Sequence, residues 1–315
     1  MRRTASIWLL LLTSLVASSV AFACGGDDDD GDAASGEVIA TIAPLGALAQ
    51  AVAGDTLTVR VLAGAGSDPH DYEVTADDRK AVGNAKVIFA IGEGIDEFLD
   101  KAKPNKDRVT TVTNGLELRE GDEAEEHEGE EGGDDHDHGE HDPHVWHDID
   151  LCKQIVDVIA KKLGEIDAAN AATYQKNAAA YKQTLDDTDK QIRDLLKSIP
   201  EANRKVVTNH DAFGYFLDRY GLVFVGAVIP AQTTAAEPSA KDIAELVDII
   251  KREKVKAIFA ESSVDPKIAQ QIAKDTSVRI VDDLFGDSLG EPGSGAETLH
   301  GMLLANAKKF SEALK

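Results

Sequence analysis

Short apolar runs, rich in Val, Ile, Ala and Phe, alternate with amphipathic segments along most of the chain. The apolar runs have the length of buried strands in a parallel sheet, and the segments between them repeat their apolar positions every three to four residues, as helices do. Strands are predicted at residues 37–42, 57–62, 86–91, 109–113, 205–208, 222–228, 256–260 and 278–281. Helices are predicted at residues 44–52, 76–84, 95–102, 150–163, 212–220, 240–254, 266–276 and 298–314. This alternation is the signature of βα units around parallel sheets.

One further helix, predicted over residues 167–199, is longer than a crossover within one sheet requires. Its inward positions are spaced 4-3-4-3-4-3-4 and are Tyr174, Ala178, Tyr181, Leu185, Thr188, Ile192, Leu195 and Ile199. At about 1.5 Å per residue this helix would be roughly 45 Å long. Such a seam also suits one half of a coiled-coil dimer. A second βα series begins directly after the helix, however, and this favours a rigid connection between two lobes.

The predicted fold is therefore α/β, with two Rossmann-like lobes, each a small parallel sheet flanked by helices, joined by one long rigid helix. The N-terminal lobe is expected at residues 37–166 and the C-terminal lobe at residues 200–315. A chain of 315 residues with 43% hydrophobic content is long enough for two such cores. We expect a monomer.

Residues 1–23 have the pattern of an export signal. Two arginines precede an apolar stretch, residues 7–20, which is short for a membrane span, and an A-x-A cleavage site ends at Ala23. Cys24 follows directly, and residues 24–36 form a tether rich in Gly and Asp. The arrangement resembles that of a bacterial lipoprotein with Cys24 as the lipidated residue, anchored to the outer face of the cytoplasmic membrane. Ordinary secretion of a soluble protein is the alternative.

The net charge of −24 is concentrated in two places. Asp27–Asp30 and Asp32 supply five negative charges, and residues 120–142 supply thirteen more without any Lys or Arg. The remaining chain is close to balanced, at about −6. Since no basic stripe is present to neutralise phosphates, nucleic acid is excluded as a partner. A cation is the natural partner of the acidic segment.

The acidic segment lies in a predicted loop, residues 117–142, called the acidic loop below. It contains His127, His136, His138 and His141. Imidazole beside carboxylate is a typical ligand combination for a borderline divalent cation such as zinc. These four histidines are therefore auxiliary metal ligands in our interpretation, and a merely solubilising loop is the alternative.

Further candidate ligands lie just after predicted strands, where open parallel sheets bind their ligands. They are His70, His144, His210 and Asp287. His70 and His144 both stand in an Asp-Pro-His sequence followed two residues later by an aromatic residue. The Asp can accept the second N–H of the imidazole and so fix its tautomer. Two lobes that face each other would bring two of these side chains each to one cleft.

Two neighbouring residues are auxiliary candidates. Glu261 directly follows the strand predicted at residues 256–260 and is either a reserve ligand or a cap for the next helix. His147 either replaces His144 as a ligand or is a solvated neighbour of it.

Six motifs together carry a resemblance that covers essentially the whole chain after the export signal. They are Ser67-Asp68-Pro69-His70-Asp71-Tyr72-Glu73, Asp142-Pro143-His144-Val145-Trp146, Thr208-Asn209-His210-Asp211-Ala212-Phe213-Gly214-Tyr215-Phe216, Ala236-Glu237-Pro238-Ser239, Phe259-Ala260-Glu261-Ser262-Ser263 and Leu284-Phe285-Gly286-Asp287-Ser288-Leu289. With them the chain resembles the substrate-binding proteins of bacterial zinc/manganese ABC transporters, whose two lobes are joined by a rigid helix. The resemblance implies that His70, His144, His210 and Asp287 are the four metal ligands. The acidic loop before His144 is similar to that of zinc-specific members, whereas His147 stands where the family more often has an apolar residue.

The expected function is the capture of Zn²⁺ outside the cytoplasm and its delivery to an ABC permease and its ATPase. Three imidazoles and one carboxylate suit zinc, and manganese would be better served by a second carboxylate in place of His210. A Mn²⁺- or Fe²⁺-binding protein of the same transporter type and a stand-alone zinc buffer are the alternatives. A zinc hydrolase with Glu261 as general base is less favoured, because the chain has no HExxH, nucleophile elbow or phosphate-cradling loop. We therefore expect no enzymatic activity.

Overall fold

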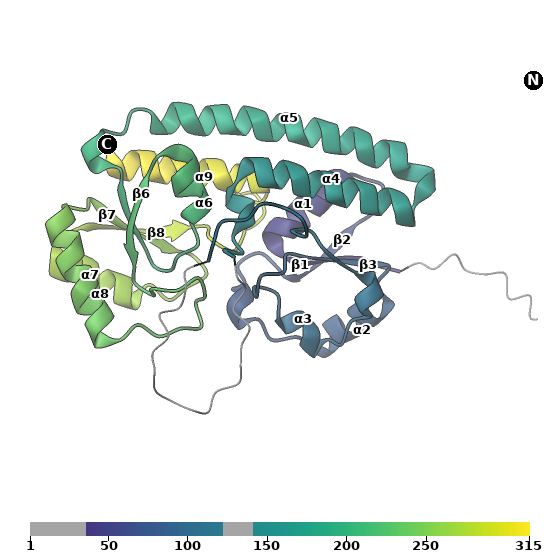
Figure 1. Ribbon diagram of the computed structural model, residues 1–315, viewed down its shortest axis with the longest axis horizontal. Coiled ribbons are helices and arrows are strands. Elements are labelled where there is room, and N and C mark those ends of the chain that lie inside the picture. The colour runs from purple at the N-terminus through teal and green to yellow at the C-terminus, as the bar shows by residue number, and fades with distance from the viewer. Residues whose placement is uncertain (1–35, 122–140) are drawn as a thin grey trace, which may run out of the picture. The chain divides into compact units, whose positions relative to one another are not determined.

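The computed structural model of the chain describes residues 36–121 and 141–315 (Figure 1). The export signal, Cys24, the tether and three of the loop histidines (His127, His136 and His138) lie outside the described residues. Within the described ranges no helix combines the length and the apolar character that a membrane crossing requires.

The N-terminal lobe is built on a four-stranded parallel sheet with the strand order β2-β1-β3-β4. Its strands are β1 (Val38–Ile42), β2 (Val59–Ala63), β3 (Val87–Ala90) and β4 (Val109–Thr111). The helices after the first three strands are α1 (Ala43–Ala53), α2 (Ala76–Asn84) and α3 (Phe98–Lys101). Every residue of β1 and β3 is buried, as expected for central strands covered on both faces.

The C-terminal lobe repeats this plan with the strand order β6-β5-β7-β8, again all parallel. Its strands are β5 (Lys205–Thr208), β6 (Val223–Ala227), β7 (Ala257–Glu261) and β8 (Arg279–Leu284). Its helices are α6 (Gly214–Tyr220), α7 (Ala240–Glu253), α8 (Lys267–Thr276) and α9 (Leu299–Leu314). The predicted α/β fold with two parallel sheets is confirmed.

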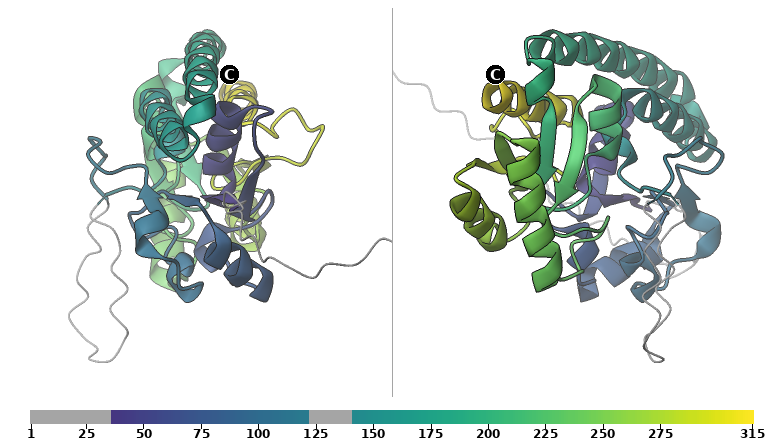
Figure 2. Two further views of the ribbon diagram at one scale, coloured as in Figure 1. Left: turned by 90° about the vertical axis from the view of Figure 1, so that its right-hand side faces the viewer. Right: turned by 60° about the vertical axis from the view of Figure 1, so that its left-hand side comes forward.

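Two long helices connect the lobes, α4 (Ile149–Ile166) and α5 (Ala171–Leu196). In Figure 1 α5 runs along both lobes, and both views of Figure 2 show it on the outside of the structure, next to α4. Its inward side packs on α4 and α1 at one end and on α9 at the other. Because this packing buries Tyr174, Leu185 and Ile192 within the chain, no apolar seam is left for a coiled-coil partner.

The last turns of α5 differ from the predicted seam. The prediction places Leu195 inward, three residues after Ile192. In the structure Leu196, four residues after Ile192, is buried, and Leu195 is only half-buried. A straight helix has 3.6 residues per turn and drifts away from a strict 3.5-residue repeat, which explains the shift.

The helix predicted at residues 95–102 is shorter than expected, since only α3 (Phe98–Lys101) is helical. The segment before it turns tightly, with φ of +88° at Gly92, +53° at Glu93 and +85° at Gly94. Two glycines tolerate these angles at no steric cost, and the turn delays the start of the helix. Asp96 stabilises this turn because its buried carboxyl accepts hydrogen bonds from the N–H groups of Ile91 and Gly92.

Arg219 on α6 ties the C-terminal lobe to both connecting helices. Its guanidinium lies 3.3 Å from Asp148 Oδ2 and 2.8 Å from Asp150 Oδ2, at the start of α4. It also lies 2.8 Å from Asp189 Oδ1 on α5. Only 13% of the Arg219 side chain is exposed. This buried guanidinium links carboxylates at the start of α4 and on α5 to α6.

Replacing Arg219 with Met should lower the free energy of unfolding by about 2–4 kcal/mol, because three neighbouring carboxylates would lose the cation that they share. Among the described residues, Asp150 would keep only Lys153, and Asp189 only Arg193, as a cationic partner. Urea unfolding of the metal-free protein measures this loss. The matched control is Arg252→Met on α7, whose side chain is 66% exposed and whose removal should change stability by less than about 0.5 kcal/mol. Equal urea midpoints for the two variants would contradict the prediction.

Candidate metal site

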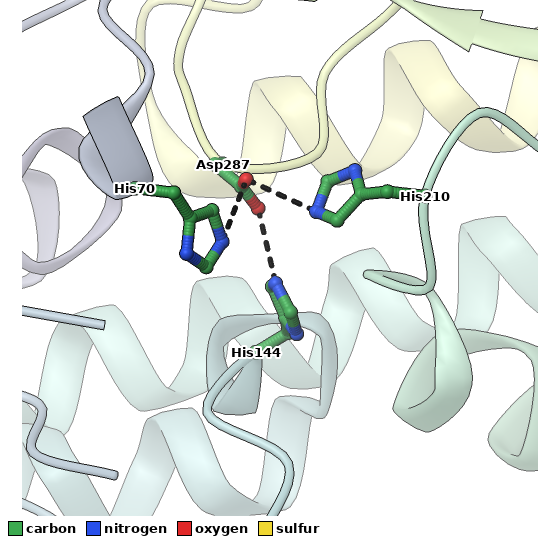
Figure 3. A group of neighbouring side chains, drawn as sticks. All are labelled: His70, His144, His210 and Asp287. Atoms are coloured by element: carbon green, nitrogen blue, oxygen red, sulfur yellow. Dashed lines mark ion pairs between the residues drawn. The ribbon is translucent and has the colours of Figure 1, made fainter. Parts of the chain in front are cut away.

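Four side chains from both lobes meet at the carboxyl ends of the sheets (Figure 3). His70 follows β2 in a short 3-10 turn, Pro69–Asp71, and His144 follows β4 by way of the acidic loop. His210 lies two residues after β5, and Asp287 lies three residues after β8. One ligand atom from each side chain lies within 4.8 Å of all the others. The structure therefore brings the four predicted residues together.

Asp287 lies at the centre of this group. Its Oδ2 is 3.5 Å from His70 Nε2 and 3.2 Å from His210 Nε2, and its Oδ1 is 3.4 Å from His144 Nε2. All five of these atoms are buried and have no hydrogen-bond partner in the described part of the chain. Unpaired buried polar atoms are costly and call for an explanation. Three imidazole nitrogens and a carboxylate facing one small space are a donor set that fits a divalent metal ion.

The second nitrogens of two of these rings are held by carboxylates. His144 Nδ1 donates to Asp142 Oδ1 over 2.8 Å, and His210 Nδ1 donates to Glu261 Oε1 over 2.6 Å. Each bond keeps a proton on Nδ1, so Nε2 is the ring nitrogen that can bind an ion. The tautomer control predicted for the Asp-Pro-His sequence thus occurs at His144.

At His70 the same prediction is wrong. Asp68 accepts a hydrogen bond from the backbone N–H of His70 over 2.9 Å, but no bond joins it to the ring. Its other oxygen accepts from the Thr234 hydroxyl over 2.6 Å, a contact from the C-terminal lobe that the local motif does not encode. His70 is accordingly the least firmly oriented of the three imidazoles.

Arg119 connects the base of the acidic loop to His144. Its guanidinium lies 3.2 Å from Asp142 Oδ2, while the other oxygen of Asp142 holds the His144 ring. The Tyr215 hydroxyl donates to the Asp142 carbonyl and accepts from the Arg119 N–H, so α6 braces the same corner. This positively charged partner of Asp142 was not predicted, because nothing in the local sequence distinguishes Arg119 from a surface arginine.

Burial and charge set the protonation of the site when no metal is bound. Burial alone lowers the pKa of a histidine, and it does so for His70. At His210 the neighbouring carboxylates of Glu261 and Asp287 outweigh burial and raise the pKa well above its usual value. At Asp287 burial would raise the pKa, but His210 and His144 hold the pKa well below its ordinary value. The metal-free site therefore holds a proton on His210 opposite an ionised Asp287.

Metal binding should consequently release protons at neutral pH, because an ion can use His210 Nε2 only after its proton leaves. As pH falls, protons compete more strongly with the metal, and affinity should decrease. Titration calorimetry with zinc in buffers of different ionisation enthalpy measures the number of protons released. An enthalpy that does not depend on the buffer would contradict the prediction.

The auxiliary candidates lie outside this group of four. Glu261 orients His210 and does not cap the next helix, since α8 begins after Pro266 without a side-chain cap. Of the two alternatives for His147, the solvated neighbour is wrong, because this side chain is fully buried. Its ring lies 4.8 Å from the Phe213 ring and donates from Nε2 to the Gly286 carbonyl. Burial lowers the pKa of His147 to about 3, so it stays neutral. His141 lies instead 3.2 Å from Glu93 Oε2.

Known proteins are similar to this chain over most of its length. Residues 38–313 match the family described as zinc-uptake complex component A, periplasmic. The manganese-binding lipoprotein MntA of Halalkalibacterium halodurans is 29% identical over 319 residues, which cover 100% of this chain and 99% of that protein. MntA of Bacillus subtilis is 30% identical over 316 residues, which cover 97% and 99%. The periplasmic zinc binding protein TroA from Treponema pallidum matches with a TM-score of 0.79 and 30% identity, covering 89% of this chain and 99% of TroA.

The match to TroA includes both lobes and the long helix, so the predicted architecture agrees with a solved fold. The metal ABC transporter substrate-binding lipoprotein SsaB of Streptococcus sanguinis is 30% identical over 313 residues, which cover 95% of this chain and 96% of that protein. These similarities are to metal-binding proteins of ABC transporters, which rules against the zinc hydrolase considered from the sequence. The family match covers both sheets and all four clustered side chains. The chain therefore belongs to the zinc-uptake complex component A family, the substrate-binding proteins of metal ABC transporters.

Proposed function

We propose that this protein captures Zn²⁺ with His70, His144, His210 and Asp287 and delivers it to an ABC permease that is driven by a separate ATPase. The observation that supports this most is the set of five buried ligand atoms that lack a hydrogen-bond partner among the described residues and face one another at the carboxyl ends of the two sheets. Two ligands come from each lobe, so a bound ion would connect the lobes directly. The zinc ion is the transported cargo and takes part in no reaction.

The choice of zinc rests on the donor set. Three imidazoles and one carboxylate are typical of zinc, whereas manganese prefers sites richer in oxygen. The names of relatives include both metals, since MntA is called manganese-binding and TroA zinc-binding. Mn²⁺ transport is therefore the second candidate function. Zinc binds more tightly than manganese to most nitrogen and oxygen sites, so the preference has to be measured in competition.

The location we propose is the outer face of the cytoplasmic membrane, with a lipid on Cys24 and the protein as a monomer. The relatives named MntA are lipoproteins, and Cys24 directly follows the cleavage pattern at Ala23. For the acidic loop we propose weak, auxiliary zinc binding through its histidines. Of these histidines, His141 lies within the residues that the structure describes. Its ring contacts Glu93, and its backbone forms a β-bridge with Glu120 at the base of the acidic loop.

Radioactive zinc uptake by cells that lack this protein tests the transport proposal. Uptake at low external zinc should fall and should return with the wild-type gene but not with a gene that carries Asp287→Asn. Loss of manganese uptake with unchanged zinc uptake would support the second candidate. If neither uptake changes, the transport proposal fails.

A further inference from the structure

We propose that Glu261 is a positioning residue that orients His210 toward a divalent cation bound at the site. The inference rests on the proposed function, because it concerns how the same site holds its ion. It assigns Glu261 a place behind a ligand, where it touches the ring and not the ion.

Two hydrogen bonds fix Glu261 against the residue pair that carries the ligand. Its Oε1 accepts from His210 Nδ1 over 2.6 Å, and both side chains are fully buried. Its backbone N–H donates to Asn209 Oδ1 over 3.1 Å. The ends of β5 and β7 are thus joined by two hydrogen bonds, one from the imidazole and one to the residue before it. Rotation of the ring would break the bond to Oε1, so Nε2 stays directed at Asp287.

The fold makes room for this carboxyl group by means of a glycine. A Cβ atom at Gly286 would lie 1.8 Å from Glu261 Oε2 and 2.5 Å from Cδ, so no other residue fits at position 286 while Glu261 keeps its place. Oε2 itself is buried and has no hydrogen-bond partner within the described ranges. Such an oxygen costs stability. A folded protein that keeps it beside a metal site has a functional use for the carboxyl group.

The contacts of Glu261 differ from those of the carboxylate behind His144. Asp142 contacts the Arg119 guanidinium as well as the His144 ring. No Lys or Arg among the described residues forms an ion pair with Glu261. The bond to the His210 ring is therefore the contact through which the Glu261 side chain acts on the site.

Glu261→Gln tests the inference, because the amide keeps the size of the side chain but is a weaker acceptor for the His210 Nδ1–H than the carboxyl group. Zinc affinity should fall by about 10–100-fold, the usual effect of changing a group that holds a metal-ligating histidine. The matched control is Asp96→Asn, which alters another buried carboxyl, one that accepts from Thr41 and two backbone N–H groups far from the four ligands in sequence. Its zinc affinity should equal that of the wild type.

Nitrogen-15 spectra of the histidine rings separate positioning from mere stabilisation. In the zinc-loaded protein Glu261→Gln should shift the Nδ1 signal of His210, while the His144 and His70 signals serve as unchanged internal standards. Unaltered affinity, an unaltered His210 signal, or an equal affinity loss in Asp96→Asn would each overturn the inference. Failure of the wild-type protein to bind zinc would instead reject the proposed function.

A second variant remains informative even if Glu261→Gln folds poorly. As a single substitution, Gly286→Ala should weaken zinc binding, because its methyl group would displace the Glu261 carboxyl group. In a Glu261→Ala background the same change should cost much less, since the atoms it meets are gone. Additive effects of the two substitutions would show that Gly286 does not act through Glu261 and would overturn the inference.

Discussion

Asp287→Asn should weaken zinc binding by about 100–1,000-fold. Apparent binding free energies for four-ligand zinc sites are about 10–16 kcal/mol, so one ligand accounts for roughly 3 kcal/mol, and each 1.4 kcal/mol is a factor of about ten. Asp287 is the only carboxylate in the group of four and faces all three imidazoles at 3.2–3.5 Å. The substitution exchanges one carboxylate oxygen for an amide nitrogen, which is not a metal ligand, and removes the charge nearest to the ion.

A competition titration against a zinc chelator of known affinity measures this effect. Asp282→Asn is the matched control, because Asp282 lies on the same strand, β8, and is exposed. The control should bind zinc like the wild type. A decrease of less than threefold for Asp287→Asn would mean that this carboxylate is not a ligand.

Zinc should stabilise the protein strongly, because one ion would link two ligands of the N-terminal lobe, His70 and His144, to two of the C-terminal lobe, His210 and Asp287. At a free zinc concentration about a thousand times the dissociation constant, binding to the folded state adds about 4 kcal/mol. In a chain of this size each kcal/mol raises the Tm by roughly 2 °C, so an increase of about 8 °C is expected.

Thermal unfolding of chelator-stripped protein, with and without zinc, measures this increase. Calcium at the same concentration should have little effect, since it prefers sites built of oxygen atoms. Asp287→Asn should lose most of the zinc-dependent increase at that same zinc concentration. A wild-type Tm that zinc leaves unchanged would contradict a tight site between the lobes.

The strands and the four clustered side chains were predictable because local sequence determines both. Short runs such as Val87–Ala90 are fully apolar and have the length of buried strands, and each of the four ligands follows a predicted strand after a few residues or one loop. The Asp-Pro-His sequence at His144 also correctly predicted the hydrogen bond from the ring to Asp142.

The remaining contacts depend on residues that are distant in sequence. Thr234 takes up the second oxygen of Asp68, and Phe213 covers His147, which a local pattern cannot reveal. The role of Glu261 depends on the absence of a side chain at Gly286. From the sequence Glu261 was predicted as a reserve ligand or a helix cap, because its actual partner, His210, lies 51 residues away along the chain.

Zinc binding by the four residues between the lobes is most directly tested by a calorimetric zinc titration of the chelator-stripped mature protein in competition with manganese. The titration is done with the complete chain and with a variant that lacks residues 122–140. We expect one tight zinc site in both proteins, with zinc displacing manganese. Zinc binding that disappears with the deleted segment, or manganese binding that equals or exceeds that of zinc, would contradict the account.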